Sequence, residues 1–244
     1  MKFDNKKPSQ NYIYGRLPAL NCLEVSKVKG VYLQNNFSDQ KLLSVITKKG
    51  INAKYVDLET LNKMTHNGNH QGILVETYPH EYSSLEEILK SAEKKVQPLI
   101  LILDEIEDPH NFGAILRSAD AFGVDGVIIK SNNQVPLNWT VAKVSTGASE
   151  YVKVAQVSNL NNVLRTLKER GYWIYAADGS GSQDYQKADY KGSVALIVGS
   201  EGRGISKLVM QNSDFIIKIP MSGHVNSLNV SVSTGILLSR IRNN

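Results

Sequence analysis

The stretch VALIVGSEGRGIS, residues 194–206, decides the fold. Its first half is an unbroken run of Val, Ala, Leu and Ile, which is typical of a strand buried on both faces of a parallel sheet. Its second half places a single carboxylate, Glu201, among Gly199, Gly202 and Gly204. Because glycine lets the backbone approach a ligand closely, the stretch predicts a buried strand that ends in a ligand-binding loop.

Other apolar runs after Pro98 repeat this pattern and are separated by segments of helical periodicity. They cover residues 99–103, 126–130, 151–156, 172–177 and 215–220. Near-continuous strands that alternate with helices indicate a parallel sheet with helices on both faces. We therefore predict a doubly wound α/β domain over residues 98–244.

Residues 1–77 have a different rhythm, with shorter apolar runs between helix-like stretches. The apolar runs are 30–34, 51–57 and 71–78, and the helix-like stretches between them are 38–49 and 58–66. The alternation predicts a small β-α-β-α-β domain. Residues 78–97 then form a linker and a first helix, in which Ser84 and Glu87 make a capping-box pattern.

The positive charge of the chain lies almost entirely in its first third. Residues 1–75 hold 11 Lys and Arg against 5 Asp and Glu, a net charge of +6, whereas residues 76–244 hold 17 against 18. Lys and Arg displace counterions from phosphates, so the first part suits a polyanion. A solvated lysine-rich surface is the alternative interpretation.

Composition excludes several classes of protein. The one cysteine, Cys22, excludes an intramolecular disulfide and a Cys-rich zinc site. No apolar run approaches the roughly 18 residues that a membrane span needs. The first residues, MKFDNKKPSQ, are charged and lack the hydrophobic core of a signal peptide. We expect a cytoplasmic protein that does not enter a membrane.

Three loops follow the carboxyl ends of predicted strands, where open α/β sheets bind ligands. They cover residues 104–123, 198–206 and 219–235. In the first loop, Pro109, Asn111 and Gly113 mark a turn, and Arg117 is expected about one helical turn inside the next helix. In the third, Ser227 is expected at the start of a helix that covers the sheet.

These loops lack the signatures of several common sites. The spacing G-x-x-G-x-G is neither the dinucleotide fingerprint nor the P-loop, and no G-x-S-x-G elbow occurs. His110 and His224 flank two of the loops, but neither has a second histidine four residues further on or a cysteine nearby. We therefore expect no metal site and no hydrolase chemistry.

Three segments together resemble the motifs of the SpoU (TrmH-like) group of the SPOUT superfamily. They are DPHNFGAILRSADAFGVDGVII, ALIVGSEGRGIS and IKIPMSGHVNSLNVSVSTGILL, and they agree with the family in order and spacing over most of residues 99–242. Members of this group are S-adenosylmethionine-dependent RNA ribose 2′-O-methyltransferases. The segment NHQGILVE, residues 69–76, is similar to the L30e-like substrate-binding domain of members that methylate a guanosine of large-subunit (23S) ribosomal RNA.

The resemblance implies a substrate, a topology and an assembly. Ribosomal RNA is the expected partner; transfer RNA, or a non-catalytic RNA-binding role in ribosome assembly on the same fold, are the alternatives. The chain near 199–204 and 219–229 is expected to thread into a deep trefoil knot, a feature that periodicity does not reveal. The family pairs through this region, which implies a homodimer.

The resemblance also assigns roles to residues. The expected cofactor contacts are Thr146, Gly147, Ala148, Gly199, Glu201, Ile219, Met221, Ser227 and Leu228. Arg117 is the residue implied to activate the 2′-hydroxyl, with Asn111, Glu201, Ser227 and Asn229 around it. A guanidinium keeps its proton up to a pH above about 12. Arg117 therefore acts either as a base or, as we prefer, by orienting the hydroxyl and stabilising negative charge.

The last predicted helix supports the expected homodimer. Val230, Ile236, Leu237 and Leu238 join the Leu228–Val232 stripe to make it apolar almost all round. One sheet buries one stripe of a helix, so the other stripe needs a second cover. We expect a charge at Leu238 to disrupt the dimer; a helix buried wholly in its own subunit is the alternative.

Overall fold

The structure, a computed structural model, describes residues 12–25, 28–78 and 80–243. The chain divides into two compact units, the first ending at His80 and the second beginning at Glu81. Both combine helices with a sheet, and the second is built on a wholly parallel sheet. The predicted α/β class, with a small first domain before a parallel-sheet domain, is confirmed.

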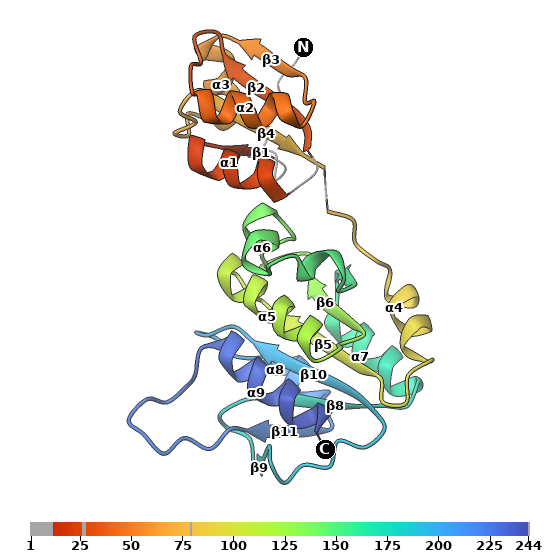
Figure 1. The fold of residues 1–244 in the computed structure, drawn as a ribbon. Helices are drawn as coiled ribbons and strands as arrows, with labels where there is room; N and C mark the ends of the chain where they lie inside the picture. The colour runs from red at the N-terminus through yellow and green to blue at the C-terminus, as the bar shows by residue number, and fades with distance from the viewer. Residues whose placement is uncertain (1–11, 26–27, 79, 244) are drawn as a thin grey trace. The chain divides into compact units, whose positions relative to one another are not determined.

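The described part of unit 1 contains a four-stranded sheet and three helices (Figure 1). Its elements are β1 (Tyr12–Tyr14), α1 (Arg16–Val25), β2 (Val28–Gln34), α2 (Gln40–Lys48), β3 (Ala53–Val56), α3 (Leu58–Thr65) and β4 (Ile73–Thr77). The strand order is β1-β4-β2-β3, with β4 antiparallel to both neighbours. The sequence pattern predicts β2 to β4 and misses β1 and α1. A three-residue strand and a weakly amphipathic helix leave little periodic signal.

His70 fixes the loop that leads into β4. Its ring is 6% exposed, its Nε2 lies 3.0 Å from Oδ1 of Asn62, and its Nδ1 accepts the Gly72 N–H at 3.0 Å. Nδ1 therefore carries no proton, and burial lowers the pKa of His70 below its ordinary value. His66, four residues earlier, is exposed with a left-handed φ of 51°. His66 and His70 have the H-x-x-x-H spacing of a helical ligand pair, but both lie beyond the last residue of α3, Thr65.

We expect this histidine to make stability depend on pH. As pH falls below about 6.5 the unfolded chain binds a proton on His70 that the folded chain refuses, so the free energy of unfolding should decrease until pH reaches the lowered folded-state pKa. An NMR titration of the His70 ring gives that pKa, and urea unfolding gives the stability. The His70→Gln variant should lack this decrease; parallel pH profiles for variant and wild type between pH 6.5 and 5 would contradict the expectation.

Unit 2 is a seven-stranded parallel sheet in the order β7-β6-β5-β10-β8-β11-β9. Its elements are α4 (Leu85–Ala92), β5 (Leu99–Asp104), α5 (Pro109–Ala121), β6 (Gly126–Lys130), α6 (Trp139–Val144), the 3-10 helix η1 (Ala148–Glu150), β7 (Val154–Val157), α7 (Leu160–Glu169), β8 (Tyr172–Ala177), β9 (Gln183–Asp184), β10 (Ser193–Gly199), α8 (Lys207–Gln211), β11 (Phe215–Lys218) and α9 (Val230–Arg242). All six predicted strands occur. The largest shift is at β7, which begins three residues later than expected.

Helices cover both faces of this sheet, as predicted (Figure 1). The strand β5 sends Leu99, Leu101 and Leu103 into the core under α5 and α9, and Ile100 and Ile102 into the core under α4, α7 and α8. Alternate residues of one strand therefore feed two separate cores, which explains why the run has no polar member. The Ser84–Glu87 capping box begins α4, also as predicted.

Two helix starts differ from the sequence prediction. Helix α9 begins at Val230, because Asn229 caps it by accepting the Ser231 N–H at 2.9 Å, whereas Ser227 is exposed in the preceding loop. Helix α5 begins at Pro109 behind the cap Asp108, so the predicted turn is its first part. Arg117 consequently lies about two turns inside α5, and the expected one turn is wrong.

The expectation that a charge at Leu238 disrupts the dimer is also corrected. Leu238 is fully buried against the sheet of its own unit, together with Val230, Leu237 and Ile241. Val232 is 51% exposed. A charge at Leu238 would therefore disrupt the core of unit 2 and would say little about a dimer.

Candidate functional site

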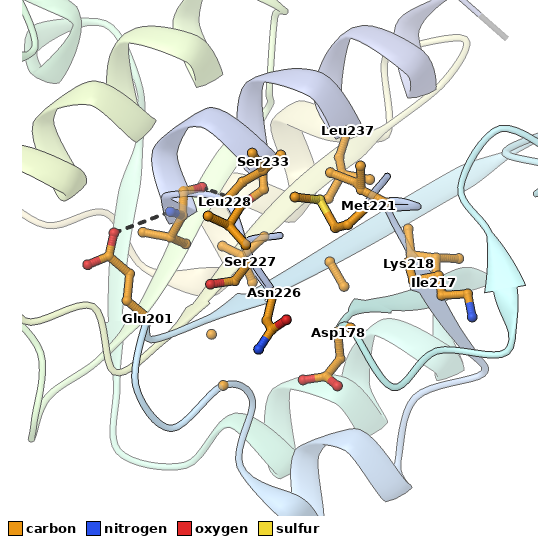
Figure 2. A pocket seen from close by; sticks show the side chains of 18 of the residues that line it. Asp178, Glu201, Ile217, Lys218, Met221, Asn226, Ser227, Leu228, Ser233 and Leu237 are labelled. Carbon is orange, nitrogen blue, oxygen red and sulfur yellow. Dashed lines mark hydrogen bonds between the residues drawn. The ribbon is translucent and has the colours of Figure 1, made fainter. Parts of the chain in front are cut away.

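A cavity of about 630 Å³ opens at the carboxyl ends of β8, β10 and β11 (Figure 2). Its wall combines the loops after these strands with the first turns of α9. The lining residues are Ala177, Asp178, Gly179, Val198, Gly199, Ser200, Glu201, Gly204, Ile217, Lys218, Ile219, Pro220, Met221, Gly223, Val225, Asn226, Ser227, Leu228, Val230, Ser233 and Leu237. We call it the β10 pocket. Glu201 lies at one end and Lys218 at the other, with Ser227 and Asn226 between them.

The glycine loop is shaped by a close backbone contact. Ser200 and Gly204 exchange backbone hydrogen bonds of 3.2 and 2.9 Å, which closes a tight loop that carries Glu201. A Cβ on Gly199 would lie 2.2 Å from the carbonyl carbon of Gly204. Only glycine fits at position 199, whereas a Cβ on Gly202 would meet nothing within 4 Å.

The base of this loop is tied to the end of β5. Oδ2 of the buried Asp104 accepts the Ser206 N–H at 2.7 Å. Lys130 donates to Glu105 at 2.6 Å, which lowers the pKa of Glu105 and keeps it ionised. Arg203 reaches the other oxygen of Glu105 at 3.3 Å, but its side chain is 64% exposed, so this ion pair adds little stability.

The side-chain amide of Asn229 connects the three predicted loops, 104–123, 198–206 and 219–235. The Nδ2 of Asn229 donates to Oδ1 of Asn111 at 2.9 Å and to Oε1 of Glu201 at 2.5 Å. The N–H of Val230 also points to Oε1 of Glu201, at 3.4 Å. Since Asn229 uses its oxygen as the cap of α9, both ends of its side chain are engaged. This network holds Glu201 at the edge of the β10 pocket.

The predicted site residues divide into three groups. Gly199, Glu201, Ile219, Met221, Ser227 and Leu228 all line the β10 pocket. Asn111 and Asn229 are joined to it by hydrogen bonds. Arg117 and the segment Thr146, Gly147 and Ala148 do not line it.

These remaining residues lie elsewhere in unit 2. Arg117 is exposed on α5, and its side chain makes no hydrogen bond or ion pair within the described chain. Thr146 has a left-handed φ of 56° in the turn between α6 and η1. The roles implied for Arg117 and for residues 146–148 stay predictions.

Sequence reasoning missed one side of the β10 pocket. Asp178 and Gly179 follow β8 directly, and Asp178 accepts from the N–H of Ser180 at 2.9 Å. The signal was available, because the apolar run 172–177 ends at these residues and ligands bind beyond the carboxyl ends of parallel strands. Val230, Ser233 and Leu237, at helical spacing on α9, complete the wall.

The β10 pocket suits a small organic molecule with charged ends. Ile219, Leu228 and Leu237 supply an apolar wall, while Asp178, Glu201 and Lys218 supply charges. Within residues 12–25, 28–78 and 80–243 no group of three or more His, Cys, Asp or Glu is arranged to hold a metal ion. No helix in this part of the chain is long and apolar enough to cross a membrane.

Two family models match the chain, one for each unit. The model for the SpoU rRNA methylase family matches residues 98–239, and the model for RNA 2′-O ribose methyltransferase substrate binding matches residues 12–83. Together they account for most of the sequence.

Individual proteins agree with these models. The chain is 44% identical over 236 residues to YacO of Bacillus subtilis (strain 168), a TrmH family tRNA/rRNA methyltransferase by name, with 95% of this chain and 94% of the relative covered. It resembles a TrmH family structure from Porphyromonas gingivalis at a TM-score of 0.62 and 27% identity, covering 95% and 89% of the two chains. The SpoU methyltransferase AviRb from Streptomyces viridochromogenes, solved with AdoMet, shares the fold at a TM-score of 0.65 and 20% identity, with 95% and 89% covered.

Proposed function

The chain belongs to the SpoU rRNA methylase family, and on that premise we propose that it methylates a ribose 2′-hydroxyl of RNA. S-adenosylmethionine is the cofactor, as it is in the AviRb complex of the same fold. The observation that carries the proposal is the β10 pocket, whose wall contains six of the nine residues that the family resemblance assigns to the cofactor. Its apolar wall suits an adenine ring, and its charged side chains suit the polar ends of the cofactor.

Ribosomal RNA, at a guanosine of the large subunit, is the substrate we favour. Support comes from the match of unit 1 to a substrate-binding model and from the net charge of +6 in residues 1–75, although Lys2, Lys6, Lys7 and Lys27 lie outside the described residues. The relatives are named for both tRNA and rRNA, so transfer RNA is the second candidate. An RNA substrate agrees with a cytoplasmic location.

The proposed mechanism gives the protein three tasks. When bound, the cofactor supplies an electrophilic methyl group. The protein must align the ribose hydroxyl, exclude water and favour loss of the hydroxyl proton. We assign alignment to the Asn111–Asn229–Glu201 network with Ser227 beside it, and stabilisation of the developing alkoxide to Arg117. The chain near 199–204 and 219–229 is proposed to form the knot that the family resemblance implies.

Methyl transfer itself tests the proposal. Full-length protein is incubated with labelled S-adenosylmethionine and either 23S ribosomal RNA or transfer RNA, and 2′-O-methylated positions are mapped by their resistance to alkaline cleavage. Label on a ribosomal guanosine is expected. Label on tRNA alone would favour the second candidate, base methylation would reject the reaction, and RNA binding without transfer would indicate a non-catalytic binder.

We also propose a homodimer that covers the free face of α9. This face borders a second hollow of about 730 Å³, lined among others by Ser118, Val232, Gly235 and Ile236. The opposite face of α9 is already buried in its own core. Arg117 lies on α5, the helix that supplies Ser118 to this hollow. We propose that in the dimer Arg117 reaches the β10 pocket of the partner subunit, which would give an exposed arginine outside its own pocket wall a part in catalysis.

A charge at Val232 tests this dimer. Val232→Lys should lower the dimer content and the activity together, because a lysine would be buried unpaired in the interface while the subunit core is untouched. Sedimentation and methyl transfer are measured across one dilution series. Leu208→Lys, at a residue of α8 that is 58% exposed, is the matched control and should change neither. A fully active monomer would contradict the proposal.

A further inference from the structure

Unit 1 has a hollow of its own, at the end of the sheet where β1, β2 and β3 finish and β4 starts. It measures about 650 Å³, and we call it the unit 1 hollow. Arg16, Phe37 and several side-chain amides line it, and none of the described residues in its wall is acidic. The family match assigns substrate binding to residues 12–83 as a whole and singles out no residue in this hollow.

Phe37 offers a fixed aromatic surface. Its N–H donates to the Gln34 carbonyl at 2.8 Å, and its ring packs so closely on Gly72 that a Cβ there would lie 3.0 Å from Cδ2 of Phe37. The ring is only partly buried. An aromatic ring held in place beside open solvent is the platform on which proteins stack unpaired bases.

Arg16 sits beside this ring and is weakly held. Its guanidinium carbon lies 5.6 Å from the centroid of Phe37, and its one ion pair with a described residue, Asp39, is 3.7 Å long. The Arg16 side chain of that pair is 54% exposed, so replacing Asp39 by another anion costs little free energy. A phosphate oxygen would bind the guanidinium better than Asp39 does, because Arg binds phosphate through two hydrogen bonds at once.

Several side-chain amides around the Phe37 ring are available to form hydrogen bonds with a ligand. Those of Gln34, Asn36 and Asn69 make no side-chain hydrogen bond to another described residue. Each presents one acceptor and two donor protons, which match the mixed edge of a nucleobase. Gln71, by contrast, is already engaged, since its Oε1 accepts the Arg16 N–H at 2.8 Å.

The segment that carries Asn69 is rigid. His66, Asn67 and Gln71 hold left-handed φ values of 51°, 61° and 50°, a conformation that costs free energy at residues other than glycine. The buried His70 ring ties this segment to α3 through Asn62. The hollow is therefore shaped before any ligand arrives, which reduces the entropy lost on binding.

We propose that the unit 1 hollow binds one unpaired nucleotide of the RNA substrate. The base stacks on Phe37, the free amides bond its edge, and Arg16 binds its phosphate. A peptide ligand is disfavoured, because the described wall of the hollow has Phe37 as its one phenyl ring and no carboxylate for a basic side chain. This inference rests on the proposed RNA substrate and adds the part of the RNA that unit 1 recognises.

The test compares variants of full-length protein. They distinguish stacking on the aromatic ring from the mere presence of an apolar side chain of similar size. Phe37→Leu keeps an apolar side chain but removes the ring, so affinity for a short single-stranded RNA of mixed sequence should fall about tenfold. Phe37→Tyr should restore most of it. Arg16→Ala should weaken binding and reduce its salt dependence. Tyr55→Ala, at a residue of β3 that is 56% exposed and outside the hollow, is the matched control.

Fluorescence anisotropy with the single strand, and with the same strand annealed to its complement, gives the affinities. The Phe37→Leu loss should be confined to the single strand, and titration with S-adenosylmethionine should give wild-type affinity for every variant. Equal single-strand affinity for Phe37→Leu and wild type would overturn the inference, as would an equal loss with duplex. If RNA binds in this way but no methyl is transferred, the proposed reaction fails and the inference stands.

Discussion

Replacing Arg117 with alanine should reduce methyl transfer at least about 100-fold, the usual cost of removing one group that stabilises charge in a transition state. The fold should survive, because Arg117 is exposed on α5 and its side chain makes no hydrogen bond or ion pair with a described residue. Binding of S-adenosylmethionine should also survive, since Arg117 does not line the β10 pocket. The measurement is single-turnover transfer, with thermal unfolding and cofactor titration of the same sample.

Two further variants test which property of the Arg117 side chain contributes to methyl transfer. Arg117→Lys should recover little activity, because an ammonium is a point charge and lacks the planar fork of donors. Arg165→Ala removes a second exposed arginine, on α7 at the other face of the sheet, and should leave transfer unchanged. Near wild-type turnover in Arg117→Ala would remove this residue from the mechanism.

Gly199→Ala should lower the affinity for S-adenosylmethionine by about 10- to 100-fold, because overpacking of a rigid site costs roughly 1–3 kcal/mol. The added Cβ would lie 2.2 Å from the carbonyl carbon of Gly204 and 2.4 Å from the N of Ile205. Both are backbone atoms, so the strand end and the glycine loop must separate. That movement displaces Glu201 and opens the wall of the β10 pocket.

Gly202→Ala is the matched control for this variant. It adds the same methyl group to the same loop, where it would meet nothing within 4 Å, and it should keep the affinity within about twofold. Calorimetric titration of cofactor into each protein makes the comparison. Unchanged affinity in Gly199→Ala would show that the close contact with Gly204 is not needed to form the pocket.

Six strands of unit 2 could be predicted because they are largely apolar runs, whereas β9, the polar pair Gln183–Asp184, left no such signal. Leu99 to Leu103 lie between two helical layers, so no position tolerates a polar residue, and the run is easy to see. Strand β1 gave no such signal, since Tyr12 and Tyr14 are only partly buried and flank a single buried residue, Ile13. Burial on both faces of the sheet therefore made these strands of unit 2 predictable from sequence. The first elements of unit 1 lack such burial and could not be predicted.

Six residues of the β10 pocket could be selected from the sequence through the family resemblance, but their geometry could not. Ser227 and Asn229 are both good helix caps, and only the contact of Asn229 with Asn111, 118 residues away, and with Glu201 selects between them. The need for glycine at 199 likewise comes from a contact with Gly204 across a tight loop. Local patterns carry no information on such pairings, so the resemblance of whole motifs supplied what periodicity could not.

The pairing of β5 with β10 has a consequence for the biosynthesis of the protein. These central strands are neighbours in the sheet, yet about 90 residues separate them along the chain, and α9 covers them only later still. Unit 1 pairs its strands within residues 12–77 and can fold while the rest is being translated. On the ribosome one backbone edge of β5 stays unpaired until residues 193–199 emerge, and the core on the α9 side of the sheet is completed only after that. A slow, non-local step of this kind exposes nascent chains to aggregation and makes them clients for chaperones.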